Sequence, residues 1–143
     1  MMVAFNFKQR FVPAILAGTK FQTIRKVRQS VPAVGAKLQL YTGQRTAATV
    51  LIGRAKLASV EPVWIVVDPN PPYEATGIAV HDQNGSMGPD ALLRLAKADG
   101  FETVADMVMF FSRTHRNGQA HTISFAGHIY RWTGFQPANK EAP

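Results

Sequence analysis

The sequence contains no cysteine. Disulfides, a thiolate metal site and a cysteine nucleophile are therefore excluded. The longest apolar run, at 63–67, is far shorter than the ~20 residues that a membrane-spanning helix requires. The first residues also lack the basic flank and the apolar stretch that mark a secretory signal. We therefore expect a cytoplasmic protein without a membrane partner, whose 143 residues form one compact domain.

Common cofactor motifs are absent as well. The sequence has neither the Gly-x-Gly-x-x-Gly fingerprint of dinucleotide-binding domains nor a phosphate-binding loop that ends in Gly-Lys-Ser or Gly-Lys-Thr. Its four histidines show no spacing typical of metal ligands. We therefore predict no metal site and no cofactor.

Acidic residues are missing from the first sixty positions. This part of the chain carries a net charge of +10 and the remainder carries −3, which together give the overall +7. The simplest explanation is a solvated basic surface, but such surfaces normally mix both signs. A field of one sign instead favours partners that bear phosphate, such as RNA or a nucleotide.

Alternating apolar positions predict strands, and glycine or proline marks their ends. The expected strands lie at 2–7, 21–25, 36–41, 49–57 and 63–67, with a short one at 78–81 and two segments around Gly127. Helices are predicted at 11–17, closed by Gly18, at 89–99, stopped by Gly100, and from Thr103, where Asp106 completes a capping box. The segment 68–88 is expected to be mostly a loop that covers part of the rim of the domain, beside its cleft. This order predicts an α+β domain whose sheet curls into a barrel.

The strand at 21–25 carries most of the side chains that suggest chemistry. Its two-residue period places Thr23 and Arg25 on one face, with Lys20 at its entrance and Lys26 just beyond it. A lysine, a hydroxyl and a guanidinium that converge would grip an anion, or activate the hydroxyl if burial makes the lysine a base. The plainer alternative is a threonine selected for strand propensity between solvated cations.

Asp99 is a second unusual position. It falls in the last turn of its predicted helix, where a negative charge faces the negative end of the helix dipole at a cost of roughly 0.3 to 1 kcal/mol. A nearby cation such as Lys20 would offset that cost.

The loop "YTGQRT" at 41–46 combines side chains that suit nucleic acid. Tyr41 is able to stack on a base, and Thr42, Gln44 and Arg45 are able to donate hydrogen bonds to a phosphate or a base edge. A tight turn with a half-buried tyrosine explains the same residues equally well.

The stretch "FKQRFVPAILAGTKFQTIRK" resembles the signature of the ASCH family, Gly-x-Lys-x-x-Thr-x-Arg after a first helix. Gly18, Lys20, Thr23 and Arg25 all fall in register with that motif. The segments "LAKADGFETVADMVMFF" and "FAGHIYRW" are also similar to this family, and "LYTGQRT" is similar to its phage-associated members. The resemblance implies a PUA-like mixed β-barrel of about five or six strands with three helices. It would form a single ASCH domain at 1–135, followed by a flexible tail at 136–143.

The resemblance also implies candidate functions. A bacterial branch of the family comprises small amidohydrolases that remove the acetyl group from N4-acetylcytidine with a lysine, a threonine and a glutamate. By motif position Lys20 and Thr23 correspond to the first two, and Asp99 stands where the glutamate would be, one methylene shorter. Other members resemble RNA binders or have been linked to ribonuclease activity. The predicted function is therefore binding of RNA or a modified nucleoside by a monomer, with hydrolase activity as one possibility. The alternatives are a ribonuclease and a non-catalytic module that contacts RNA or a phage or host protein.

Overall fold

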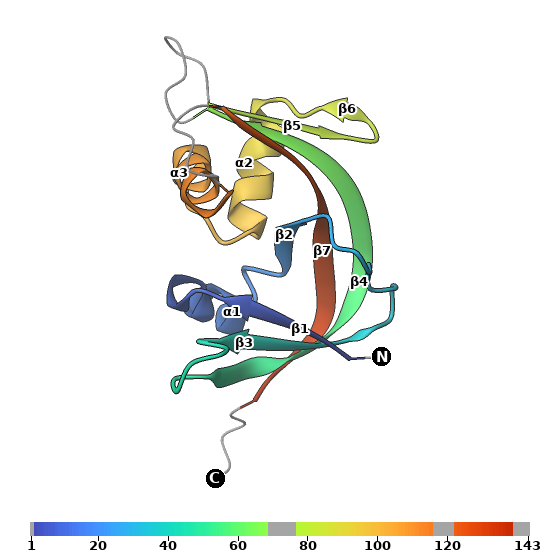
Figure 1. Ribbon diagram of the computed structural model, residues 1–143, viewed down its shortest axis with the longest axis vertical. Helices are drawn as coiled ribbons and strands as arrows, with labels where there is room; N and C mark the ends of the chain where they lie inside the picture. Colours follow the sequence, from blue (N-terminus) through green and yellow to red (C-terminus); the bar gives the residue numbers. More distant parts are fainter. Residues whose placement is uncertain (1, 69–76, 116–121, 139–143) are drawn as a thin grey trace.

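The computed structural model describes residues 2–68, 77–115 and 122–138. Two long antiparallel strands, β4 (Val50–Val67) and β7 (Ile123–Pro137), pair along most of their length and bow into a curved ribbon (Figure 1). The register of this ladder shifts twice in the first half of β4. Such irregularities increase local bend and twist, which suits a sheet that curls toward a barrel.

The other strands extend this ribbon at both edges. β3 (Lys37–Thr42) pairs with the first half of β4, and β5 (Ile78–Asp82), followed by β6 (Gly85–Ser86), pairs with its second half. β1 (Met2–Phe7) lies parallel to β3, and β2 (Gln22–Lys26) runs antiparallel to β7. The five longer strands that follow one another across the curved sheet are thus ordered β1-β3-β4-β7-β2. Within the described residues no ladder joins β1 to β2, so a seam lies between these two outer strands.

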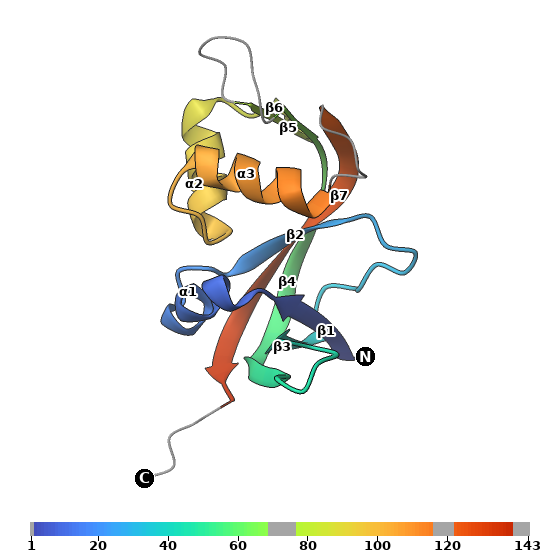
Figure 2. The ribbon, with the colours of Figure 1, turned by 60° about the vertical axis from the view of Figure 1, so that its left-hand side comes forward.

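The helices all lie on the concave side of the ribbon (Figures 1 and 2). They are the 3-10 turn η1 (Gln9–Phe11), α1 (Val12–Ala17), α2 (Pro89–Ala98) and α3 (Val104–His115). Their apolar sides close the core against inward-facing sheet residues such as Ile65 and Ile129. As predicted, glycines in the left-handed conformation end the first two α-helices, with φ of 82° at Gly18 and 97° at Gly100.

The α+β class is confirmed, since the part of the chain that the structure describes contains three α-helices and a mixed sheet. The described residues form a sheet of seven strands, slightly more than the five or six expected, because the short β5–β6 hairpin adds two strands to the β1-β3-β4-β7-β2 series. The predicted capping box is half formed. Thr103 Oγ1 accepts a hydrogen bond from the Asp106 amide at 3.0 Å, but the Asp106 carboxylate binds Arg10 at 2.6 Å instead of returning to the helix start.

Two predicted strand breaks were wrong, since β4 and β7 each run through a residue that normally interrupts a strand. Pro62 lies where neither β3 nor β5 pairs with β4, so its missing N–H removes no bond from a ladder on that side. Gly127 lies inside β7 because a Cβ there would be 2.6 Å from the carbonyl oxygen of Arg25. Pro62 is therefore tolerated within β4, whereas Gly127 permits the close approach of β2 to β7.

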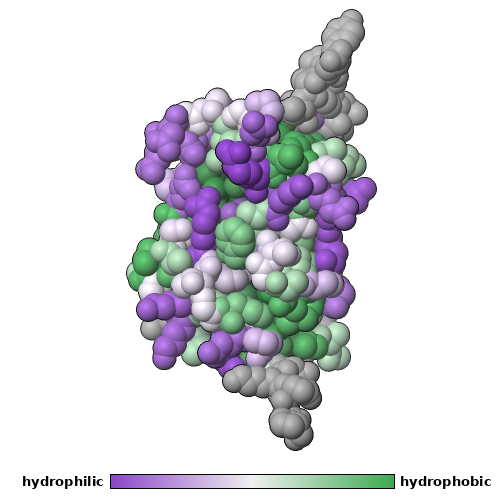
Figure 3. Space-filling view, turned by 180° about the vertical axis from the view of Figure 1, so that it is seen from behind, coloured by the Kyte–Doolittle hydropathy of each residue, from purple (hydrophilic) through white to green (hydrophobic). Residues whose placement is uncertain are grey.

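The remaining predictions concern the surface and the chain end. Of the excursion at 68–88, residues 69–76 lie outside the described part, and the remainder forms mainly the β5–β6 hairpin. β7 continues past the predicted domain boundary at 135, and 139–143 of the predicted tail are not described. Seen from behind, hydrophilic side chains line much of the outline and hydrophobic ones gather in separate patches (Figure 3). No helix of the described part has both the length and the apolarity to cross a bilayer.

Candidate functional site

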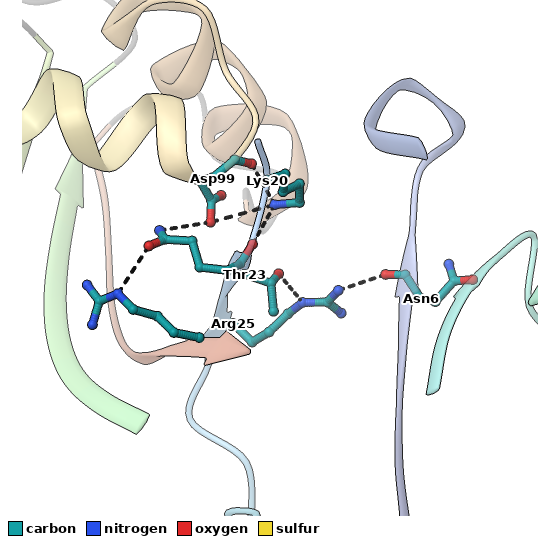
Figure 4. Close-up of polar contacts among 7 residues, drawn as sticks. Asn6, Lys20, Thr23, Arg25 and Asp99 are labelled. Atoms are coloured by element: carbon teal, nitrogen blue, oxygen red, sulfur yellow. Dashed lines mark hydrogen bonds and ion pairs between the residues drawn. The ribbon is translucent and has the colours of Figure 1, made fainter. Parts of the chain in front are cut away.

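The structure buries Lys20 at the C-terminal end of α2. The chain turns at Gly18, which brings Lys20 to the entrance of β2 with only 2% of its surface exposed. Its ammonium donates hydrogen bonds to the Asp99 carbonyl at 2.5 Å and to the Gln22 carbonyl at 2.8 Å (Figure 4). The last carbonyls of a helix have no partner within the helix. Lys20 therefore caps α2 as well as lying in the candidate site.

The Asp99 side chain lies beside the same ammonium. Its Oδ1 is 3.7 Å from Lys20 Nζ, an ion-pair distance that is too long for a direct hydrogen bond, and it accepts a bond from Gln22 Nε2 at 3.2 Å. Gly100 makes this approach possible, because a Cβ at this position would lie 2.9 Å from Lys20 Cδ. The structure thus brings together two predicted residues that are 79 positions apart in the sequence.

Burial changes the proton affinity of both partners. Desolvation lowers the pKa of Lys20 to about 8, an effect that the Asp99 charge opposes and the Arg25 charge reinforces. Desolvation also raises the pKa of Asp99, against the opposing charge of Lys20 and the hydrogen bond from Gln22. A pKa of about 8 leaves roughly a tenth of the lysine neutral at pH 7. Both the charged and the neutral amine are therefore accessible near physiological pH.

Thr23 and Arg25 share one face of β2, as predicted. Arg25 Nε donates to Thr23 Oγ1 at 2.9 Å, and its NH2 group donates to the carbonyl of Asn6 on β1 at 2.7 Å (Figure 4). The guanidinium also lies 5.1 Å from the ring centroids of Phe5 and Phe7. Burial lowers the pKa of Arg25 to about 10, which still leaves it charged at neutral pH. Arg25 therefore spans the seam between β1 and β2 as a cation.

These residues open into a cleft of about 200 Å³, here called the Lys20 cleft. It is lined by the polar side chains Lys20, Thr23, Arg25 and Asp99 together with the rings of Phe7, Phe11, Phe110 and Phe111. Thr23 and Arg25, which were predicted to share one face of their strand, both line this cleft together with Asp99. The prediction that the segment 68–88 covers its rim finds no support, since none of the described residues of that segment lines the cleft.

A second hollow of about 390 Å³ adjoins the Lys20 cleft and shares Asn6 and Arg25 with it. We call it the arginine pocket; its lining residues are Ala4, Phe5, Asn6, Arg25, Arg28, Gln44 and Arg45. Gln44 and Arg45, from the loop after β3, thus lie around the same hollow as Arg25 of β2. Six of the predicted site residues therefore fall into two connected compartments, namely Lys20, Thr23, Asp99, Arg25, Gln44 and Arg45.

Three predicted binding residues lie elsewhere. Lys26 is exposed and lines neither compartment. Tyr41 is half-buried and donates its hydroxyl proton to Gln39, whereas Thr42 is buried and donates to the Phe7 carbonyl at 2.8 Å. The Thr42 hydroxyl fastens β3 to β1, which is a structural contact. Binding roles for Lys26, Tyr41 and Thr42 stay predictions.

Some residues that shape the site escaped sequence reasoning. Gln22, which alternates with Thr23 along β2, is buried and links Asp99 to Arg131. Its Nε2 donates a hydrogen bond to the Asp99 carboxylate, and its Oε1 accepts one from Arg131. Asn6 and Arg28 line the arginine pocket from β1 and from the segment after β2. The sequence indicated Arg28 only as one of the basic residues in the first sixty positions, which contain no acid, and did not predict a specific role for it. Among the residues that the structure describes, no group of three or more histidines and acids is arranged to hold a metal ion.

No family model matches the chain, and neither does any curated protein. The chain is similar to crystal structures of ASCH from Zymomonas mobilis and of two of its single-residue mutants. Each is 16% identical, with TM-scores of 0.48 to 0.49, and the matches cover 94% of this chain and 68% to 70% of those chains.

The family named for these structures is the one that the sequence motif resembles. The function of the chain has to be inferred from its own geometry.

Proposed function

We propose that the chain binds RNA or a modified nucleoside, with a base in the Lys20 cleft, and that it hydrolyses the acyl amide of N4-acetylcytidine. The observation that carries this proposal is the convergence of Lys20, Thr23, Asp99 and Arg25 in one cleft with aromatic walls. At about 200 Å³ the cleft is smaller than the roughly 300 to 1,000 Å³ of pockets for drug-sized ligands. It therefore suits a base with its acyl group better than a whole nucleotide.

The reaction would use Thr23 as nucleophile. Its Oγ1 attacks the acetyl carbonyl and passes its proton to neutral Lys20, giving a tetrahedral oxyanion that the Arg25 cation stabilises. The C–N bond then breaks, cytidine leaves with a proton delivered by way of Asp99, and the acetyl group stays on Thr23 as an ester. Water hydrolyses that ester to acetate and regenerates the threonine.

The neutral amine suits this role in one respect. It retains two N–H groups, which match the Gln22 and Asp99 carbonyls, and leaves one lone pair for the incoming proton. Lys20 and Thr23 make no direct hydrogen bond, although both are in the described part of the chain, so substrate binding would have to bring the two groups together.

The test is to incubate the purified protein with N4-acetylcytidine and to follow cytidine and acetate by chromatography. Thr23→Val keeps the shape of the nucleophile and removes its hydroxyl, and Lys20→Met removes the base while keeping a long side chain. Both variants should lose at least about a hundredfold in turnover. Circular dichroism and melting curves verify that they fold. Turnover that survives in Thr23→Val would refute the proposed nucleophile.

A second candidate function is binding without cleavage. It is favoured by the surroundings of Lys20, whose ammonium faces two carbonyls and lies 4.8 Å from the centroid of the Phe11 ring, as suits a cation. In that case the wild type binds cytidine or N4-acetylcytidine, yet releases no acetate. RNA and nucleoside ligands are distinguished by salt, because log affinity for single strands falls at about 0.7 per phosphate contact with log salt and an uncharged nucleoside responds little.

A further inference from the structure

The arginine pocket has the charge of an anion site. Three of its lining residues, Arg25, Arg28 and Arg45, are cations, and none is an aspartate or glutamate. In the described part of the chain, none of these three arginines forms an ion pair with a carboxylate. The three positive charges therefore surround one hollow of about 390 Å³ without a directly paired carboxylate, and only the charge of Arg25 is partly offset, by Asp99 at a distance.

The loop that carries Arg45 is held in place before any ligand binds. Thr46 and Thr49 both donate hydroxyl protons to the Gly43 carbonyl, at 2.6 and 2.9 Å, and the Gln44 amide donates to the Asn6 side chain on β1 at 2.8 Å. Arg45 itself has a φ of 70°, which is unusual for a residue other than glycine. Strain of this kind persists where the surrounding structure fixes it, and it tends to occur at ligand sites.

Arg25 connects the arginine pocket to the Lys20 cleft. Its hydrogen bonds to Thr23 and Asn6 use two of its five N–H groups, so donors remain for a ligand. Arg28, whose guanidinium lies 5.9 Å from the Phe5 ring centroid, faces the same hollow from the segment after β2. Guanidinium groups bind phosphate oxygens with charge-assisted and often bidentate hydrogen bonds.

We propose that the arginine pocket binds the phosphate of a nucleotide whose base occupies the Lys20 cleft. The location of the base rests on the function proposed above, whereas the anion site rests on the three arginines alone. The preferred ligand would then be a nucleotide, free or within RNA, and a nucleoside without phosphate would bind less tightly. The Lys20 cleft is too small for a whole nucleotide. The arginine pocket adjoins it at Asn6 and Arg25, so the phosphate of a nucleotide bound in the cleft would lie in that pocket.

Calorimetry with cytidine, cytidine 5′-monophosphate, cytidine 3′-monophosphate and inorganic phosphate tests this directly. At least one monophosphate should bind about tenfold more tightly than cytidine. Arg28→Gln and Arg45→Gln should each reduce the ratio of monophosphate to cytidine affinity by about tenfold. Arg54→Gln is the matched control, because it removes the same charge from an exposed residue that does not line the pocket, and it should leave the ratio within about twofold. A cytidine trinucleotide that binds more tightly than both monophosphates would identify a phosphodiester as the ligand group.

The outcomes separate this inference from the proposed function. If cytidine binds and phosphate adds no affinity, or if Arg54→Gln reduces the ratio as much as Arg28→Gln does, the phosphate site is refuted and the base cleft stands. If inorganic phosphate binds in competition with the monophosphates while cytidine does not bind, the anion site stands and the base cleft is refuted. Absence of binding by all four ligands refutes both.

Discussion

Replacing Asp99 by asparagine removes one buried negative charge and keeps almost the same shape. The amide oxygen still accepts the bond from Gln22, and the backbone carbonyl still accepts the bond from Lys20. The change therefore isolates the effect of charge on the lysine. We expect it to lower the pKa of Lys20 from about 8 into the acidic range, so that the amine is neutral at pH 7.

The size of the effect follows from the ion-pair distance. At 3.7 Å and an effective dielectric constant of about 20, two unit charges attract by about 4 kcal/mol. One pH unit corresponds to about 1.4 kcal/mol. Even if water entering the variant screens half of that attraction, the titration should move by more than one pH unit.

Carbon-13 NMR of lysines labelled at Cε measures this titration, and the signal that disappears in Lys20→Met assigns the resonance. Glu61→Gln is the control, because it removes a carboxylate that is paired with Arg131 instead of Lys20. If the Lys20 midpoint is the same in the wild type and Asp99→Asn, Asp99 is neutral in the folded protein. The ion pair, and with it the proton-transfer role proposed for Asp99, would then be wrong.

Three further predictions test the buried site by stability. Folding lowers the pKa of Lys20 from 10.5 to about 8, so the unfolded chain binds more protons than the folded chain between these two pH values. The free energy of unfolding of the wild type, measured with urea relative to that of Lys20→Met, should therefore rise by about 3 kcal/mol between pH 8 and pH 10.5. A flat difference would show that the amine titrates normally. Gly100→Ala should lower the free energy of unfolding by about 2 kcal/mol or more in the same assay, because φ is 97° and the new Cβ would lie within 3.0 Å of Lys20 and Phe11. A decrease below about 0.5 kcal/mol would contradict this packing. Tyr130→Phe should be neutral or stabilise by up to about 1 kcal/mol, because the buried hydroxyl has no hydrogen-bond partner among the described residues; a clear loss in thermal melts would reveal a partner.

Sequence periodicity predicted the local elements well and their extent less well. Strand alternation and glycine stops placed β1, β3 and the ends of α1 and α2, because these features depend on neighbouring residues alone. The breaks predicted within β4 and β7 were wrong because Pro62 and Gly127 normally interrupt strands. Their acceptance here depends on which strand lies alongside, and a single sequence does not reveal that.

The candidate site shows the same limit. The two-residue period of the strand predicted that Thr23 and Arg25 share a face, and this shared face allows the hydrogen bond between them. The contact of Lys20 with Asp99 depends on how α2 docks against β2, which no period within either element determines. Arg28 was missed because it follows β2 in a segment without regular structure, where periodicity assigns no face.

The seam between β1 and β2 also affects how the molecule avoids aggregation. Unpaired sheet edges are templates for strand addition by other chains, and proteins commonly protect them with charged side chains. Arg25 occupies this seam with a charge that would be costly to bury under an added strand, and Arg28 and Arg45 stand beside it. Polyanions that neutralise these arginines would therefore remove the charges that protect the edges of both β1 and β2. Solubility in the presence of polyphosphate should therefore fall before the fold itself is lost.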